Sequence, residues 1–372
     1  MPIGKVSTVN RARTPLELAT QVVAGGVAPA AAAGFATRRP DGRWELSAGG
    51  ATTAFFDLAS LTKPMTAFSV ARVPSLRSEN LGSILPVVRG TASAEVPLEL
   101  LLAHRAGLEA NLPLFRPLLS GGAVELQEAL IEAAGARRAD ALGPVPAEGF
   151  APVYSDLGYV LIGEALSCMA NAADVGDVLD AAVVSPLGLA GKLGSARALL
   201  ALGAAASFAE RVVPTEVVPW RGGEVRGRVH DENAFALRGA GASGHAGMFG
   251  TVEAVLAFGV AAVDAIMRGT GPLASEGDLG WLVRPRHGGS LRAGFDGKSE
   301  GGGSTAGERA GARTFGHLGF TGTSLWIDPD ADAVVVLLTN RVHPTRENTA
   351  IRAARPLAHD ALFGMAAEAS GR

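Results

Sequence analysis

The chain has 372 residues, of which 48% are hydrophobic and 19% are charged. This length exceeds what one hydrophobic core usually supports, so we expect a compact globular protein with two domains. A formal net charge of -3 argues against nucleic acid as a partner, and no apolar run reaches the roughly 18 residues of a membrane span.

The first 16 residues carry Lys5, Arg11 and Arg13 without a continuous apolar run, so they lack the layout of a secretory signal. For the sequence as written we predict cytoplasmic residence, and periplasmic residence if the start codon is misassigned. The oligomeric state is left open by the sequence.

The first predicted elements are a helix over 16–25 and two strands over 30–36 and 44–48, joined by a turn at 39–42. A helix is then expected from Ser60 to about Ala71. Prolines break up the loop-rich region that follows.

The middle of the chain predicts mostly helices. They cover 98–108, ended by Gly107, then 123–135, 157–168, 175–188, 196–206 and 251–268, and a strand-like run covers 212–219. Ser155 or Asp156 can cap the helix that follows them. Cys168, the only cysteine, fits the apolar spacing of that helix and is expected to be buried and inert. A single cysteine excludes an internal disulfide and a cysteine-based metal site.

The last part of the chain predicts antiparallel sheet. Glycine and charge dominate 288–312, which indicates a loop or a weak edge segment. Strands over 315–318, 324–327 and 333–340 are expected to return beside the first hairpin, and 347–365 to form a closing helix.

The pattern Ser60-x-x-Lys63 places a hydroxyl and an amine on one face of the predicted helix. A lysine can take the proton of a serine nucleophile only if its pKa is lowered, and we expect desolvation at the helix start to supply this. Arginine cannot be deprotonated in a protein, and among 33 basic residues the chain uses lysine sparingly. The pattern alone is loose, so a chance occurrence stays open.

Tyr154 lies just before a predicted helix and is one of two tyrosines. A helix start favours negative charge, so it can help to stabilise a phenolate or a phenol that shares a proton with a lysine.

Several histidines are candidates for a site. His104 fits a structural hydrogen-bonding residue better than a base. His230 and His245, near Asp231 and Glu232, suggest a metal site, but helical ligand spacing is missing. The glycines around His245 favour a backbone turn that approaches the site closely.

The ordered motifs Ser60-x-x-Lys63, Tyr154-Ser155-Asp156 and His317-Leu318-Gly319 resemble those of the penicillin-recognising serine hydrolases. This group contains class C β-lactamases, D-alanyl-D-alanine carboxypeptidases and related esterases, and the resemblance covers nearly the whole chain. It implies an α/β (α+β) fold in which an antiparallel β-sheet is flanked by helices. Residues 1–75 and 288–372 would form this domain, and 76–287 a mostly helical inserted domain.

By the same resemblance, Ser60 would be acylated, Lys63 would accept its proton, and Tyr154 would shuttle that proton and activate the deacylating water. His317 and Gly319 belong to the third wall of the site, and the backbone N–H groups of Ser60 and Phe320 would form the oxyanion hole. No metal or organic cofactor is implied.

Two positions depart from the family pattern. Many β-lactamases have asparagine where this chain has Asp156, and an ionised aspartate cannot donate a hydrogen bond. Leu318 replaces a threonine whose hydroxyl helps to hold a substrate carboxylate.

We therefore expect a serine hydrolase that acts through an acyl-enzyme on a small ester, a D-amino-acid peptide or, weakly, a β-lactam. The alternative is a binding module of the same fold that recognises cell-wall fragments or a partner without turnover.

Overall fold

The computed structural model describes residues 9, 11–202 and 205–371. The strands of this part are β1 (Ala31–Arg38), β2 (Trp44–Gly50), β3 (Phe56–Asp57), β4 (Leu193–Ser195), β5 (Val217–Val218), β6 (Gly223–Glu224), β7 (Met248–Gly250), β8 (Asp296–Gly297), β9 (Phe315–Leu318), β10 (Ser324–Asp328) and β11 (Ala333–Thr339). The helices are α1 (Pro15–Ala24), α2 (Thr62–Ala71), α3 (Leu81–Ile84), α4 (Leu98–Leu102), α5 (Arg116–Leu119), α6 (Leu126–Gly135), α7 (Asp156–Ala170), α8 (Val175–Leu179), α9 (Ala196–Ala201), α10 (Ala205–Arg211), α11 (Glu232–Arg238), α12 (Val252–Arg268) and α13 (Ile351–Ser370).

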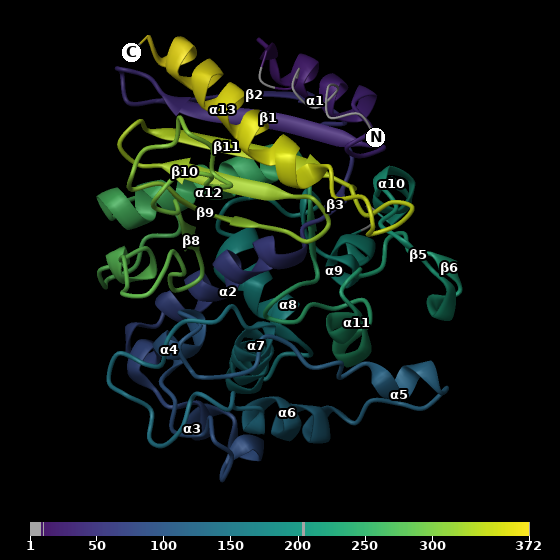
Figure 1. Cartoon of the computed structure of the whole chain (residues 1–372), viewed down its shortest axis with the longest axis vertical. Helices are drawn as coiled ribbons and strands as arrows, with labels where there is room; N and C mark the ends of the chain where they lie inside the picture. Colours follow the sequence, from purple (N-terminus) through teal and green to yellow (C-terminus); the bar gives the residue numbers. More distant parts are fainter. Residues whose placement is uncertain (1–8, 10, 203–204, 372) are drawn as a thin grey trace.

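The largest sheet of the described residues has six antiparallel strands in the order β2-β1-β11-β10-β9-β8. The first hairpin therefore pairs with the last strand of the chain, as expected. Helices α1 and α13 pack on one face of this sheet and α12 packs on the other (Figure 1). This is the mixed α/β architecture, an antiparallel sheet flanked by helices, that the sequence resemblance implied.

Strand β11 shows why both faces of the sheet are covered. All seven of its residues are buried. Val334 and Val336 belong to the core on the α12 side, whereas Val335 and Leu337 belong to the core on the α13 side. Successive side chains of a strand point to opposite faces, so an uninterrupted apolar strand needs a helix on each side.

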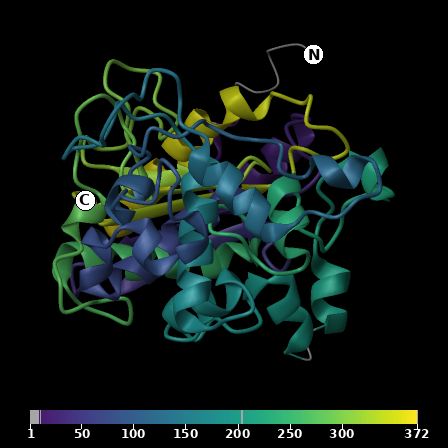
Figure 2. The ribbon, with the colours of Figure 1, turned by 90° about the horizontal axis from the view of Figure 1, so that it is seen from below.

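A helical part lies below the sheet in Figure 1 and contains α3, α4, α6 and α7. Seen from below, these helices (blue to teal) lie in front of the yellow strands (Figure 2). Helix α2 contacts α7. The division into 1–75 with 288–372 and 76–287 stays a prediction, and α12 packs on the sheet although its residues fall in the second range.

Several predicted boundaries are wrong. The helix predicted over 98–108 ends at Leu102, because the backbone turns at His104, whose φ is 59°. The strand-like run 212–219 forms only β5, and the closing helix runs from Ile351 to Ser370. The predicted helix 196–206 includes residues 203 and 204, which lie outside the described part.

Cys168 is exposed, which contradicts the expected burial. It lies in the last turn of α7, where Met169 and Ala170 are exposed as well. The apolar spacing was extended one turn too far, beyond the part of the helix that packs on the core.

None of the described helices is both long enough and apolar enough to cross a membrane. The predicted compartment rests partly on residues 1–8 and 10, which lie outside the described part, and it stays a prediction.

Candidate active site

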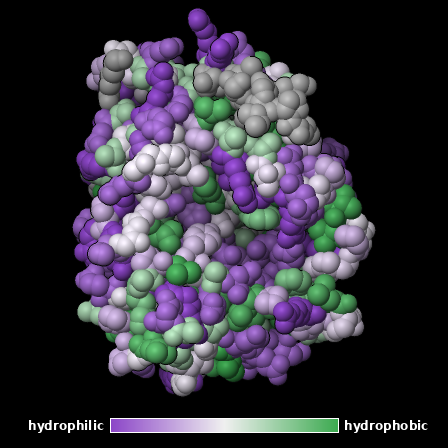
Figure 3. All heavy atoms as spheres, in the orientation of Figure 1, coloured by the Kyte–Doolittle hydropathy of each residue, from purple (hydrophilic) through white to green (hydrophobic). Residues whose placement is uncertain are grey.

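The Ser60 hydroxyl and the Lys63 amine form the centre of the candidate site. Ser60 lies in a short 3-10 turn, Ala59–Leu61, that leads directly into α2. Lys63 Nζ lies 2.8 Å from Ser60 Oγ, and its side chain is fully buried. Pro64 follows in the first turn of α2, where its missing N–H costs no hydrogen bond. Figure 3 shows a depression near the middle of this face, between the sheet and the lower helices.

Asp156 joins this centre from the start of α7. Its Oδ1 lies 2.7 Å from Lys63 Nζ. Ser155 takes the N-cap position of α7, but the expected side-chain cap is missing, since the Ser155 hydroxyl donates to the carbonyl of Glu109. The long-range ion pair takes the place of the local cap.

The ion pair changes the charge state that we expected for Lys63. Burial by itself lowers the pKa of Lys63, but the carboxylate of Asp156 and the hydroxyl of Tyr154 outweigh it, and the pKa is raised above its usual value. The expectation that desolvation lowers this pKa is therefore wrong. In the resting site Lys63 is a cation that donates hydrogen bonds to Ser60 Oγ and to the carbonyl of His245.

Tyr154 converges on the same two groups. Its hydroxyl is close enough to Lys63 and Ser60 for both to act on its pKa, and its ring centroid lies 4.9 Å from Lys63 Nζ. Burial raises the pKa of Tyr154, with the Lys63 charge acting in the opposite direction. A phenolate stabilised by the helix start is therefore not the resting form, and the group is a neutral phenol.

His104 holds Tyr154 in position, as the structural interpretation predicted. Its Nδ1 accepts a hydrogen bond of 3.0 Å from the backbone N–H of Ser155. The imidazole also stacks on the Tyr154 ring, with centroids 4.7 Å apart and planes 29° apart. Burial and the nearby Lys63 charge lower the pKa of His104 well below its usual value, so it stays neutral.

His317 in β9 forms another side of the site. Its ring centroid lies 6.0 Å from that of Tyr154. Burial, followed by the Lys63 charge, lowers the pKa of His317 to about 3, so the ring is neutral. Its Nδ1 lies 2.8 Å from the carbonyl oxygen of Leu318 and must donate to it. The free ring nitrogen, Nε2, is therefore an acceptor.

Gly319 lets β9 approach the nucleophile turn. A Cβ atom at Gly319 would lie 2.6 Å from the carbonyl oxygen of Leu58, a backbone atom that cannot easily move away. Phe320 follows, and no described residue accepts a hydrogen bond from its backbone N–H. The Phe320 ring is 49% exposed and stacks on His230 with centroids 5.7 Å apart.

Asp57 is a residue that the sequence analysis missed. It is buried, and its two carboxylate oxygens accept hydrogen bonds from the backbone N–H groups of Ala59 and His230. Its carbonyl accepts from the hydroxyl of Thr321. Asp57 thereby ties the Ser60 turn to the segment after β9. The only feature of the sequence that could have pointed to Asp57 is its position three residues before Ser60.

The histidine and carboxylate cluster is a set of separate pairs. His230 Nε2 lies 3.0 Å from Glu216, and His245 Nε2 lies 2.8 Å from Asp231. Among the described residues, no group of three or more such side chains is placed to hold a metal ion.

The expected close approach of the glycine turn is confirmed. The carbonyl of His245 lies 3.3 Å from Lys63 Nζ, and that of Gly244 accepts from the Thr66 hydroxyl. A Cβ atom at Gly244 would lie 2.0 Å from the carbonyl oxygen of Tyr159 and 3.0 Å from the backbone nitrogen of Gly163, both in α7.

We expect Gly244→Ala to destabilise the protein by about 2 kcal/mol or more, because only a backbone shift of the turn or of α7 can make room. Urea unfolding measures this. Gly135→Ala is the matched control, since no atom lies within 4 Å of the added Cβ. Equal unfolding midpoints for the two variants would contradict the close approach.

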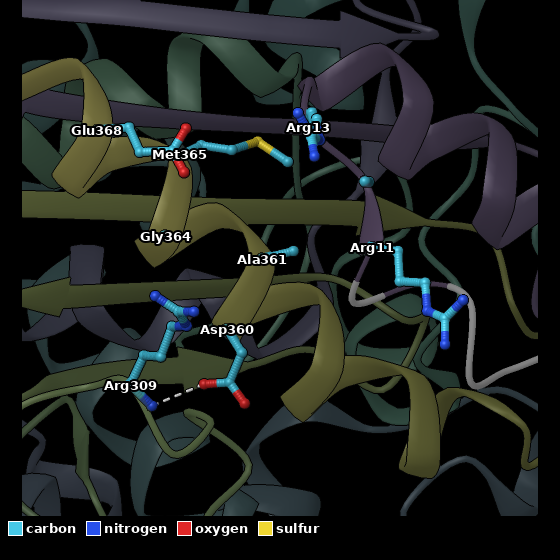
Figure 4. A pocket seen from close by; sticks show the side chains of 9 residues that line it. Arg11, Arg13, Arg309, Asp360, Ala361, Gly364, Met365 and Glu368 are labelled. Atoms are coloured by element: carbon cyan, nitrogen blue, oxygen red, sulfur yellow. Dashed lines mark hydrogen bonds between the residues drawn. The ribbon is translucent and has the colours of Figure 1, made fainter.

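A separate cavity of about 450 Å³ lies between α13 and residues 11–13 (Figure 4). Arg11, Arg13, Arg309 and Glu368 line it, together with Asp360, whose carboxylate accepts from the backbone N–H of Arg309. No residue of the candidate active site lines this cavity.

Comparison with known proteins agrees with the fold. A family model described as Beta-lactamase matches residues 21–359. The chain therefore belongs to the beta-lactamase family. Family membership supports a hydrolase, because the family includes serine hydrolases of the esterase and β-lactamase types. A search of curated protein sequences finds no significant match to this family member.

Three solved structures show how far the likeness of this beta-lactamase family member extends. EstCE1, described as a hydrolase with promiscuous acyltransferase activity, is 20% identical with a TM-score of 0.66, over 97% of this chain and 99% of that chain. A class C beta lactamase from Rhodobacter sphaeroides is 16% identical with a TM-score of 0.61, over 94% and 98%. A penicillin-binding protein homologue from Caulobacter crescentus is 18% identical with a TM-score of 0.59, over 96% and 97%. At these identities the likeness establishes the fold alone.

Proposed function

We propose that this protein is a serine hydrolase in which Ser60 forms an acyl-enzyme with a small ester or amide substrate. The observation that carries the proposal is the convergence of one hydroxyl, one amine and one phenol. Ser60 and Lys63 lie together at the start of α2, Tyr154 comes from the segment before α7, and Lys63 donates to Ser60 while both groups act on the pKa of the phenol. A serine needs an adjacent group to take its proton, and Lys63 and Tyr154 are two candidates for that role.

Each group has a distinct part in the proposed reaction. Lys63, once it is neutral, accepts the proton of Ser60 as the hydroxyl attacks the substrate carbonyl. Tyr154, whose pKa both groups influence, passes this proton to the leaving group and later helps a water molecule to attack the acyl-enzyme. The backbone N–H groups of Ser60 and Phe320 are the proposed oxyanion hole, and the free N–H of Phe320 fits this part.

The environment of Asp156 favours esters over β-lactams as substrates. Its carboxylate is paired with Lys63, and an ionised carboxylate has no proton to donate to the amide of a β-lactam side chain. Leu318 offers no hydroxyl for a substrate carboxylate. Simple esters need neither contact. EstCE1, which has the same fold, is described as a hydrolase with acyltransferase activity, which is compatible with ester substrates.

A covalent label tests the proposal directly. The protein is incubated with a fluorophosphonate, and separately with p-nitrophenyl butyrate under rapid quench, and the modified peptide is located by mass spectrometry. We expect one adduct, on Ser60. A burst of p-nitrophenol should accompany acylation if deacylation limits turnover. An unmodified Ser60 with both reagents would contradict the acyl-enzyme, and reversible ligand binding without turnover would then favour the binding module.

Tyr154→Phe is expected to lower kcat by about 10²- to 10⁴-fold with little change in stability. Phenylalanine keeps the ring that stacks on His104 and loses only the hydroxyl beside Lys63 and Ser60. Steady-state kinetics and thermal unfolding measure both effects.

Tyr159→Phe is the matched control for Tyr154→Phe. The Tyr159 hydroxyl donates to the carbonyl of Leu102 at 2.8 Å, so its loss should cost stability, about 1 kcal/mol, rather than rate. If the two variants lost the same activity, the phenol of Tyr154 would have no special part in proton transfer.

A further inference from the structure

The charge that a substrate meets beside Ser60 is the carboxylate of Asp156. Lys63 is fully buried, whereas the side chain of Asp156 is 23% exposed. Asp156 is also the first residue of α7, a helix of 15 residues, and a helix start stabilises an anion. His104 and His317 add no charge, because the pKa of each is lowered by burial.

This carboxylate is paired with Lys63 in the resting site but loses its partner when Lys63 becomes the neutral base that the reaction needs. Lys63 can accept the proton of Ser60 only after it has become neutral, and a neutral Lys63 leaves Asp156 without its counter-charge. A cation brought by the substrate would restore the pair. By repulsion, the same cation would make Lys63 easier to deprotonate.

Three guanidinium groups near the end of β9 already have acceptors within the described part of the chain. Arg355 donates to the carbonyls of Gly319 and Thr323, and Arg341 donates to the carbonyl of Phe320. Arg346 pairs with Glu216 and Glu232. Each of these cations is already committed to a backbone oxygen or a carboxylate.

We propose that the site prefers acyl donors that carry a protonated amine on the carbon next to the scissile carbonyl carbon, as in esters of α-amino acids, and that Asp156 binds this ammonium. Lys63 Nζ lies 2.8 Å from Ser60 Oγ and 2.7 Å from the buried Oδ1 of Asp156, so Ser60 Oγ and Oδ1 are separated by at most the sum of these distances, and the ammonium would meet the exposed part of the same carboxylate. An amine on the carbon next to the carbonyl falls within that span. This inference rests on the proposed acyl-enzyme function.

The reaction needs no further reagent. Ser60 Oγ forms a bond to the carbonyl carbon and its proton passes to Lys63. The bond from that carbon to the alcohol oxygen breaks, and the alcohol leaves with a proton. Water then attacks the acyl-enzyme, releases the amino acid and returns the proton to Ser60. Asp156 holds the substrate ammonium throughout and exchanges no electrons.

Three methyl esters with one carbon skeleton isolate the effect of charge. Alanine methyl ester, methyl isobutyrate and monomethyl methylmalonate carry an ammonium, a methyl group and a carboxylate on the same carbon. We expect kcat/KM, from methanol release at about pH 7, to be at least about tenfold higher for the alanine ester than for methyl isobutyrate. Monomethyl methylmalonate should be the poorest substrate. Both enantiomers of the alanine ester are measured.

Asp156→Asn should reduce the preference for the alanine ester over methyl isobutyrate by about tenfold or more. It should also shift the acid limb of the kcat/KM profile for methyl isobutyrate to lower pH by about one unit or more, because the carboxylate that raises the pKa of Lys63 is gone. If Asp156 had only a structural role, its replacement would change neither the ester preference nor the acid limb of the profile. The titratable groups facing Lys63 are Asp156 and Tyr159 of α7, Tyr154 before it, His104 after α4 and His317 of β9.

Asp41→Asn is the matched control, since Asp41 lies in the exposed turn between β1 and β2, at the sheet edge away from β9. If Asp156→Asn does not fold, the kcat/KM values of the wild-type protein for the three esters still test the charge preference. Equal kcat/KM for all three esters would overturn the charge preference and leave the acyl-enzyme standing. A wild-type protein that hydrolyses none of them and forms no Ser60 adduct would overturn the proposed function and this inference with it.

Discussion

Ser60→Ala is expected to lower kcat/KM for ester hydrolysis by at least about 10⁴-fold, because it removes the atom that forms the acyl bond. The hydroxyl accepts a hydrogen bond from Lys63, and the side chain lies in a short turn fixed by the carboxylate of Asp57. Alanine fits that turn without strain. The fold should therefore persist, with unchanged circular dichroism and a similar unfolding temperature.

Initial rates with p-nitrophenyl butyrate, together with labelling by a fluorophosphonate, measure the effect of Ser60→Ala. Ser83→Ala is the control. Ser83 is exposed on α3, so this variant makes the same serine-to-alanine change outside the site. Turnover by Ser60→Ala above a tenth of the wild-type rate would mean that another group carries the chemistry.

Lys63→Met is expected to lower kcat/KM by about 10³-fold or more, since methionine has a similar shape and no amine to take the proton of Ser60. Lys63→Arg separates charge from proton transfer. Arginine keeps the positive charge beside Asp156, but it cannot be deprotonated, so it should be as inactive as methionine. Unfolding temperatures show whether either variant also loses stability.

Lys192→Met is the control for Lys63→Met, because Lys192 is exposed and is another of the few lysines. If the activity of Lys63→Arg were close to that of the wild type, the positive charge at position 63 would matter for catalysis, whereas proton transfer by this side chain would not. The proposed mechanism would then need a different base.

The pairing of Ser60 with Lys63 was predictable because it is local. Two residues three positions apart at a helix start must lie on the same face, and the structure places their polar atoms 2.8 Å apart. The return of the last strands to the first hairpin was also predictable, since apolar strands at the two chain ends can pair and bury their faces in a common sheet.

The errors lie where a distant partner competes with a local one. Asp156 has the features of a helix cap, yet it pairs with Lys63, which is 93 positions earlier in the chain. Spacing alone cannot show that partner. Cys168 continues an apolar pattern, but the last turn of α7 extends beyond the packed core into solvent. Asp57 belongs to no local pattern in the sequence, and the N–H of His230 that donates to it lies 173 positions later in the chain.

The sequence by itself determined the candidate nucleophile with its lysine and tyrosine, the antiparallel sheet and the family pattern, because these depend on short spacings and on the order of segments. Only the tertiary structure decided the charge of the site. The ionisation of Lys63 depends on burial and on the one carboxylate that the fold brings to it, and electrostatic energies follow distance in space rather than distance along the chain.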